Sequence, residues 1–236
     1  FRLARQILNR LEDASTGAIE PDSFNAAIPD ERRQQAQDAA TVIGTTLRDR
    51  FPYAGDTQAT ETDLAELVLN RSWRPALEIT GADGLPPIAE AGNVLRATTS
   101  LKLALRLPPT VDGEQATQDL REILEAEPPY RARVSFTPQQ AATGWHAPPL
   151  ADWLAASMDQ ASRDHFGDRV MFMGEGGTIP FMALLSRAFP QAQFVITGVL
   201  GPQANAHGPD ESLHLPAVRH LTACVARIIA THGARS

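Results

Sequence analysis

The chain has 236 residues, of which 43% are hydrophobic and 21% charged, which is enough to bury a sizeable core in one large domain or two small ones. Its net charge of −7 argues against the broad phosphate-binding surface that nucleic-acid binders carry. No long uninterrupted apolar run and no apolar leader are visible, so we expect neither a membrane span nor a secretory signal. A single cysteine, Cys224, excludes an internal disulfide framework and favours a cytoplasmic protein.

The first half of the chain alternates predicted helices and strands. Helical spacing of apolar residues predicts helices over 1–13, 30–50 and 111–127. Strands are predicted over 74–80, 101–107 and 132–137. Residues 101–107 alternate so strictly that their leucines must share one face of a sheet, while Arg106 points from the other face. These patterns predict a small α+β unit with an antiparallel sheet over residues 1–137.

A linker rich in Gly, Pro and Ala, residues 138–149, precedes a change of pattern. Helices are then predicted over 150–166, 179–189 and 216–231, and short apolar strands over 169–173 and 194–199. Strand, loop and helix repeated twice is typical of a mostly parallel sheet covered by helices. Because two strands are too few for such a sheet, we interpret residues 138–236 as the C-terminal part of a larger α/β domain.

The loop at residues 174–180 follows the first of these strands and is a candidate ligand site, because open α/β sheets bind ligands at the carboxyl ends of their strands. Its glycines would let the backbone approach a ligand closely, and free amides at the following helix start could hold a carboxylate or phosphate. Thr178 could cap that helix. A tight strand-to-helix turn would explain the same glycines, but Glu175, flanked by three glycines, has little to contribute to packing.

The loop at residues 198–211 holds His207 among glycines and prolines. A histidine in such a stiff loop is well placed for metal ligation or proton transfer, although it could equally be an ordinary surface histidine, since zinc needs several ligands and no second histidine stands at helical ligand spacing. Arg106 leaves a similar choice between binding a carboxylate and being solvated. Serine-nucleophile, phosphate-loop and dinucleotide motifs are all missing from the sequence.

Taken together, the two loops resemble a known C-terminal signature. The signature is that of the zinc metallopeptidases related to carnosinase-like dipeptidases, carboxypeptidase G and aminoacylase. The resemblance lies in residues 174–180, in their spacing to Phe189-Pro190, and in residues 197–211. The first half resembles the inserted lid and dimerisation domain of that family, at residues 69–75, 91–95 and 105–109. The resemblance covers nearly the whole chain.

The resemblance implies an α+β, ferredoxin-like lid domain (1–137) followed by the C-terminal part of an α/β zinc-peptidase catalytic domain (138–236). It implies a homodimeric two-zinc hydrolase that cleaves an amide next to a free carboxylate, with His207 as a zinc ligand. Asn93 and Arg106 are expected to reach the substrate across the dimer interface, Arg106 binding its carboxylate. The residues expected to line the substrate pocket are Glu175, Gly176, Gly177 and Thr178.

Two features depart from the family pattern. The residue before Glu175 is often Arg in related enzymes and is Gly174 here, which leaves one carboxylate contact and the substrate class open. The other zinc ligands, the bridging aspartate, the general-base glutamate and a lid histidine would all belong upstream of Phe1. We therefore expect a segment of a longer enzyme that is inactive by itself.

Three hypotheses follow. The first is a zinc dipeptidase or carboxypeptidase-like hydrolase acting on a small peptide or N-acyl amino acid, with cobalt or manganese as alternatives to zinc. The second is a dimerisation and substrate-gating module without a catalytic role. The third is an α/β carboxylate-binding protein that uses Glu175 and Arg106, which would leave His207 without a purpose. Neither nucleic acid nor a membrane is expected as a partner.

Overall fold

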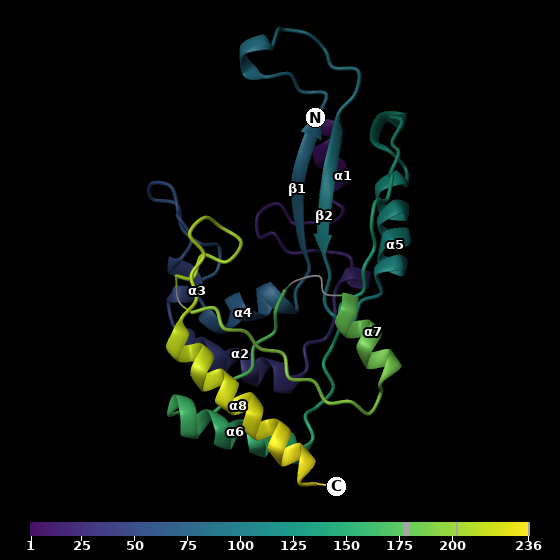
Figure 1. Ribbon diagram of the computed structural model, residues 1–236. Coiled ribbons are helices and arrows are strands. Elements are labelled where there is room, and N and C mark those ends of the chain that lie inside the picture. The colour runs from purple at the N-terminus through teal and green to yellow at the C-terminus, as the bar shows by residue number, and fades with distance from the viewer. Residues whose placement is uncertain (177–179, 202, 236) are drawn as a thin grey trace. The chain divides into compact units, whose positions relative to one another are not determined.

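The computed structural model describes residues 1–176, 180–201 and 203–235 (Figure 1). The chain divides into two compact units. The first unit comprises Phe1–His146 and Phe172–Leu185, and the second comprises Ala147–Met171 and Ser186–Ser236. The glycine-rich loop that contains Glu175 therefore belongs to the first unit, whereas His207 belongs to the second.

The helices of the first unit follow the predicted pattern with two differences. They are α1 (Arg2–Leu8), α2 (Asp30–Ile43), α3 (Thr46–Asp49), α4 (Leu64–Ser72) and α5 (Gly113–Glu125). The helix predicted over 30–50 is divided at Gly44, whose φ of 63° ends α2. The sequence analysis did not predict helix α4. Asp63 is its N-terminal capping residue, because its carboxylate accepts a hydrogen bond from the Glu66 amide.

Strands β1 (Ala76–Asp83) and β2 (Ser100–Arg106) form an antiparallel sheet, as predicted. Ala76 pairs with Arg106 at one end and Asp83 with Ser100 at the other, and the register shifts between Ile79 and Gly81, where Thr80 is the extra residue of a bulge. Strand β1 extends beyond the predicted strand over 74–80, because it continues through Gly81 to Asp83. Along β2 the leucines are half-buried and the residues between them are exposed, which confirms the predicted alternation.

The main core of the first unit lies between the leucine face of the sheet and helices α1 and α5 (Figure 1). Helix α5 contributes Ala116, Leu120 and Leu124, whose spacing of four places them on one face. The strand predicted at 132–137 is wrong: in the described structure this segment pairs with no strand. Val134 and Phe136 still pack on the core. The Phe136 amide donates its hydrogen bond to the Glu125 carboxylate at 2.6 Å instead of to a neighbouring strand. The buried members of this core are Ile7, Leu11, Ile19, Phe24, Ala116, Leu120 and Leu124.

A second, smaller cluster fixes α4 against α2. Its buried residues are Ala36, Val68, Leu69 and Trp73, the last three belonging to α4 or directly following it. The Trp73 ring meets the His146 ring edge-on, with their centroids 5.2 Å apart. Burial, followed by the nearby Arg32 guanidinium, lowers the pKa of His146. Helix α4 is thus held by apolar packing on one side, which fixes the position of the polar residues at its end.

The second unit is organised around two helices that lie side by side, α6 (Asp152–Phe166) and α8 (Leu215–Gly233) (Figure 1). Cys224 on α8 is buried, and its thiol donates to the Ala161 carbonyl of α6 at 3.3 Å. Burial raises the pKa of this thiol, as expected of a structural cysteine. Helix α7 (Pro180–Ala188) begins in the first unit and ends in the second. Among the helices that the structure describes, none combines the length and hydropathy needed to cross a bilayer.

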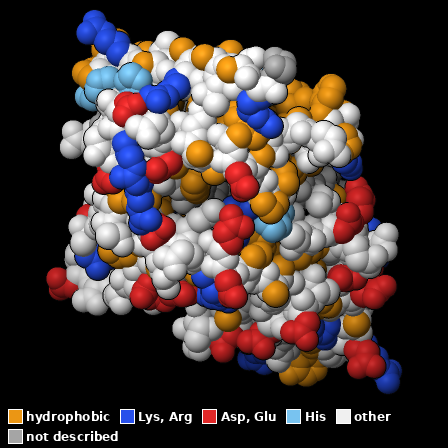
Figure 2. Space-filling view, turned by 90° about the horizontal axis from the view of Figure 1, so that it is seen from below, with side chains coloured by type: hydrophobic (Ala, Val, Ile, Leu, Met, Phe, Trp, Pro, Cys, Tyr) orange, Lys and Arg blue, Asp and Glu red, His pale blue; other side chains and the backbone are white. Residues whose placement is uncertain are grey.

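The strands predicted at 169–173 and 194–199 are wrong, since neither segment pairs with another strand within the described residues. An apolar run forms a strand only where a neighbour accepts its backbone hydrogen bonds. Here the Val170 amide donates instead to the Asp159 carboxylate of α6, at 3.3 Å. Figure 2 shows acidic, basic and hydrophobic side chains interspersed on the face of the molecule seen from below.

Candidate functional site

The candidate site forms where the last turn of α4 meets the glycine-rich loop, both in the first unit. The Arg71 guanidinium of α4 and the Glu175 carboxylate of the loop make an ion pair through Arg71 Nη2 and Glu175 Oε1. Their side chains are 32% and 56% exposed, respectively. Exposed pairs of this kind contribute about 0–1 kcal/mol, so exchange of one partner for a ligand costs little.

Two glycines allow the loop to approach α4 so closely. A Cβ atom on Gly176 would overlap the Arg71 carbonyl oxygen, and one on Gly174 would lie 2.6 Å from Ser72 Cβ. Neither glycine has a positive φ, so close approach, and not an unusual backbone conformation, requires glycine at both positions. The arginine expected before Glu175 by family resemblance would therefore have no room here.

Arg106 lies at the end of β2, on the open face of the sheet, as predicted. Its guanidinium reaches the same loop, because a Cβ atom on Gly176 would lie 2.8 Å from Arg106 Nη1. In the part of the chain that the structure describes, Arg106 has no carboxylate within ion-pair distance. With Arg71 and Glu175 paired, the cluster keeps a net positive charge at Arg106, whose planar fork can bind a carboxylate through two hydrogen bonds.

Sequence patterns brought Arg106 and Glu175 forward but missed Arg71. The two partners of the ion pair are 104 residues apart in the chain, and α4 itself was not predicted. Gly176 adjoins both arginines. Gly177 and Thr178 lie outside the described residues.

Asn93 is far from this cluster within the same chain. It is exposed in the connection between β1 and β2, residues 84–99, which joins the Asp83–Ser100 end of the sheet, whereas Arg106 is at the opposite end (Figure 1). The connection is strongly apolar at its surface: Ile88 is 96% exposed and Leu95 97%. The structure therefore does not bring Asn93 and Arg106 of one chain together.

His207 stands on an exposed loop of the second unit. Its backbone φ is 64°, and three other non-glycine residues in this loop also have positive φ: Gln203, Asn205 and Asp210. The His207 amide donates to the Glu211 carboxylate at 3.3 Å. Such conformations cost about 1–3 kcal/mol each and concentrate at functional sites.

A complete metal centre does not fit the described residues. No group of three or more His, Cys, Asp or Glu side chains that could hold a metal occurs among them, although metal sites need several such ligands. His207 can supply one imidazole at most. The described residues therefore include the predicted ligand His207 but not a group of three or more ligands around it.

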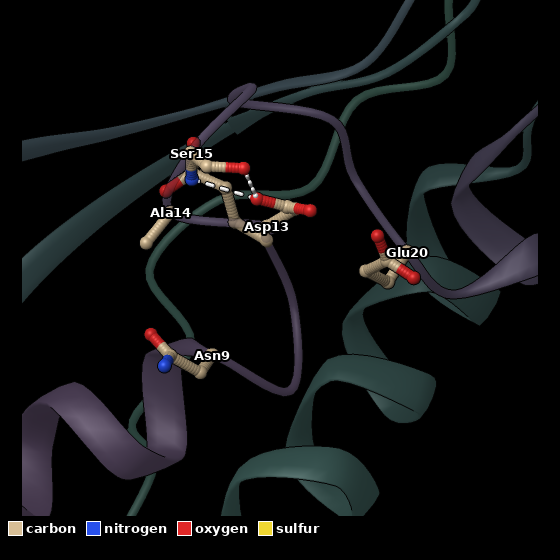
Figure 3. A pocket seen from close by; sticks show the side chains of 6 residues that line it. Asn9, Asp13, Ala14, Ser15 and Glu20 are labelled. Carbon is tan, nitrogen blue, oxygen red and sulfur yellow. Dashed lines mark hydrogen bonds between the residues drawn. The ribbon is translucent and has the colours of Figure 1, made fainter.

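A separate surface hollow of about 510 Å³ lies near the end of α1 (Figure 3). Its lining includes Glu12, Asp13 and Glu20. The Asp13 carboxylate already accepts hydrogen bonds from the Ser15 hydroxyl and amide, each at 2.6 Å, and these bonds lower its pKa. Asp13 thus stabilises the turn beside Gly17, and none of the residues predicted for the site lines the hollow.

Comparison with known families identifies the first half of the chain. Residues 1–131 match the peptidase dimerisation domain, M20_dimer. The chain belongs to this peptidase family. Its α+β fold, with a small antiparallel sheet and helices, agrees with that assignment, as does the resemblance to metallopeptidases found in the sequence.

Similar proteins extend the comparison beyond the dimerisation domain. The cysteinylglycine-S-conjugate dipeptidase of Corynebacterium striatum is 28% identical over 164 residues, which cover 68% of this chain and 35% of that protein. The di-peptidase Dug1p of Saccharomyces cerevisiae has a TM-score of 0.67 at 18% identity, covering 98% of this chain and 48% of that one. The metallo-carboxypeptidase Sso-CP2 of Sulfolobus solfataricus has a TM-score of 0.68 at 14% identity, with coverages of 96% and 52%. Human carnosine dipeptidase 1 has a TM-score of 0.64 at 16% identity, with coverages of 98% and 48%.

Over nearly its whole length, the chain has the same fold as parts of these solved peptidase structures. The chain spans about a third of the curated dipeptidase and about half of each structural relative. The structural likeness is one of fold, because the sequence identities are low.

Proposed function

We propose that this chain is the dimerisation domain and C-terminal catalytic segment, residues 1–137 and 138–236, of a cytoplasmic metallopeptidase that cleaves the amide bond next to a free carboxylate. Its substrates would be small peptides or N-acyl amino acids. The observation that carries the proposal is the Arg106 guanidinium, which is unpaired among the described residues, lies on the open face of β2 and reaches the Glu175 loop. Membership of a peptidase family and a dipeptidase relative support the same reaction class.

Each residue has a distinct proposed task. Arg106 binds the carboxylate of the substrate through a charge-assisted pair of hydrogen bonds. Gly176 keeps the loop backbone close to both Arg71 and Arg106, so that a substrate held by Arg106 lies against Glu175 and the loop. Gly177 and Thr178 are proposed to extend this lining.

His207 is the proposed metal ligand of this chain, and zinc the proposed metal, with two ions per site and cobalt or manganese as alternatives. When bound, such ions would polarise the substrate carbonyl and activate water. The remaining ligands would have to come from outside the described residues, so we assign no further step to this chain.

The active form is proposed to be a homodimer through the dimerisation domain. The exposed apolar residues of the 84–99 connection are suited to burial against a second copy. Asn93 in that connection would then serve the site of the partner subunit, because it lies at the opposite end of the sheet from Arg106 in its own chain.

The test uses the full-length protein that contains this chain. Dipeptides and N-acyl amino acids would be compared with the same compounds blocked as C-terminal amides, before and after treatment with a chelator. We expect hydrolysis of the free acids only, its loss with the chelator and its recovery with zinc. Arg106→Gln should raise KM for the acids at least about tenfold, equivalent to about 1.4 kcal/mol. Equal turnover of acids and amides would contradict the proposal.

The alternative function is a dimerisation and substrate-gating module without catalysis. It is favoured by the lack of a complete metal-binding group among the described residues. Under this alternative the full-length protein would form dimers but hydrolyse none of these compounds with any of the three metals.

A further inference from the structure

Arg71 has no task in the proposed reaction, yet its guanidinium is the group that pairs with Glu175. We propose that Arg71 is a positioning residue that holds the Glu175 carboxylate away from Arg106, so that Arg106 remains open to the carboxylate of the substrate. The inference rests on the proposed function, because it assigns the substrate carboxylate to Arg106.

The loop places Gly176, the residue next to Glu175, between Arg71 and Arg106. The neighbouring residue, Gly176, lies against the Arg71 carbonyl oxygen on one side and the Arg106 guanidinium on the other. Glu175 is the next residue along and has a flexible side chain that is 56% exposed. Because Arg106 also lies against this loop, a carboxylate released from Arg71 could pair with the Arg106 guanidinium and occupy the group that is proposed to bind the substrate.

Arg71 is well suited to this task because α4 fixes it in place. Val68, Leu69 and Trp73 are buried at the end of this helix, so the backbone at Arg71 is positioned by packing and does not depend on the ion pair. A cation in the last helical turn is also favoured by the helix dipole.

Neither a side chain at position 174 nor Arg74 could replace Arg71 as the partner of Glu175. A side chain at position 174 would collide with Ser72, since even a Cβ atom there would lie 2.6 Å from Ser72 Cβ. Arg74 is engaged elsewhere, with its guanidinium 2.5 Å from the Glu66 carboxylate and 2.7 Å from the Asn70 side-chain oxygen. Among the described residues, Glu175 is therefore ion-paired with Arg71, and Arg106 is the competing cation beside the loop.

A double-mutant cycle in the full-length protein tests this role. Arg71→Ala should raise KM for a carboxylate substrate about fivefold with little change in kcat, because Glu175 then competes for Arg106. In a Glu175→Gln background the same Arg71→Ala change should alter KM less than about twofold, since the competing carboxylate is gone. Arg71→Lys keeps the cation and should remain close to the wild type.

Arg74→Ala is the matched control. It removes an arginine three residues after Arg71, whose ion-pair partner is Glu66 and not Glu175. It should leave KM unchanged. Equal effects of Arg71→Ala in the two backgrounds would overturn the proposal, because a structural role or direct substrate contact predicts that result. A KM for Arg71→Ala equal to that of the wild type would overturn it as well.

Binding of N-acetylglycine, measured by calorimetry, separates this proposal from the proposed function. In one outcome the wild type binds N-acetylglycine but hydrolyses nothing, which refutes the proposed hydrolysis. If Arg71→Ala then weakens this binding when residue 175 is Glu, but not in the Glu175→Gln variant, Arg71 has the inferred role. If the wild type hydrolyses free acids while neither KM nor binding responds to Arg71→Ala, hydrolysis stands and the role of Arg71 is refuted. A wild type that neither hydrolyses nor binds refutes both.

Discussion

Arg10 ties the start of the chain to the end of α5 by donating to the Ala126 carbonyl at 2.5 Å, across 116 residues of sequence. Its guanidinium also donates to the carbonyls of Ile123 and Glu127, each at 3.0 Å. Carbonyl groups at a helix end have no partner within the helix, and a cation there also meets the negative end of the helix dipole. Arg10 thus acts as a long-range cap.

Replacing Arg10 should therefore destabilise the fold. Arg10→Ala is expected to lower the free energy of unfolding by about 1–3 kcal/mol, because it leaves carbonyl groups without their charged donor. Arg5→Ala, which removes an exposed arginine of α1, is the control and should stay within about 0.5 kcal/mol of the wild type. Urea unfolding followed by circular dichroism measures both. Equal midpoints for the two variants would contradict the capping role.

The closeness of the loop to α4 can be tested at Gly176. Gly176→Ala places a methyl group onto the Arg71 carbonyl oxygen, so the loop should move away from both arginines and KM for a carboxylate substrate should rise at least about tenfold. Gly233→Ala is the control, since a Cβ atom there would meet nothing within 4 Å. Wild-type kinetics for Gly176→Ala would show that the loop does not need this approach.

The lowered pKa of His146, which packs edge-on against Trp73, predicts a pH dependence of stability. Its pKa is lowered from the usual 6.5, first by burial and then by Arg32, so the folded state favours the neutral ring. Below pH 6.5 the unfolded chain takes up the proton more readily than the folded one, and the contribution of His146 is present above this pH and lost as the pH falls through the folded value. Unfolding midpoints measured from pH 8 to pH 5 should fall less in His146→Gln than in the wild type. An identical slope in both would rule out this contribution.

The two ends of the sheet predict complementation between subunits. The family resemblance implies that both residues act across the dimer interface, but Arg106 lies beside the Glu175 loop of its own chain. If Asn93 serves the partner's site and Arg106 its own, a mixed dimer of Asn93→Ala and Arg106→Gln subunits contains one intact site. Co-refolding the two impaired variants should then restore part of the activity, whereas each alone should remain impaired. The double variant Asn93→Ala/Arg106→Gln mixed with itself is the control and should restore none. Failure of the mixture to recover activity would mean that both residues serve the same site.

Sequence patterns succeeded where one local rule decided the structure. The leucines of β2 alternate with polar residues, and a strand has only two faces, so the open face of Arg106 could be predicted. The same alternation at Val134 and Phe136 misled, because an apolar face can pack on a core without a strand partner. The pair of Arg71 with Glu175 was beyond prediction, since it depends on how α4 and a distant loop fold together.

The extra residue in β1 influences the direction of the hairpin beyond it. A bulge strengthens the local twist and changes the direction in which a strand continues. The single extra residue Thr80 therefore sets the direction in which β1 leads into the long connection that carries Asn93. Insertions or deletions at this position would re-aim the tip of the hairpin while leaving the leucine face near Arg106, and the core beneath it, in their original register.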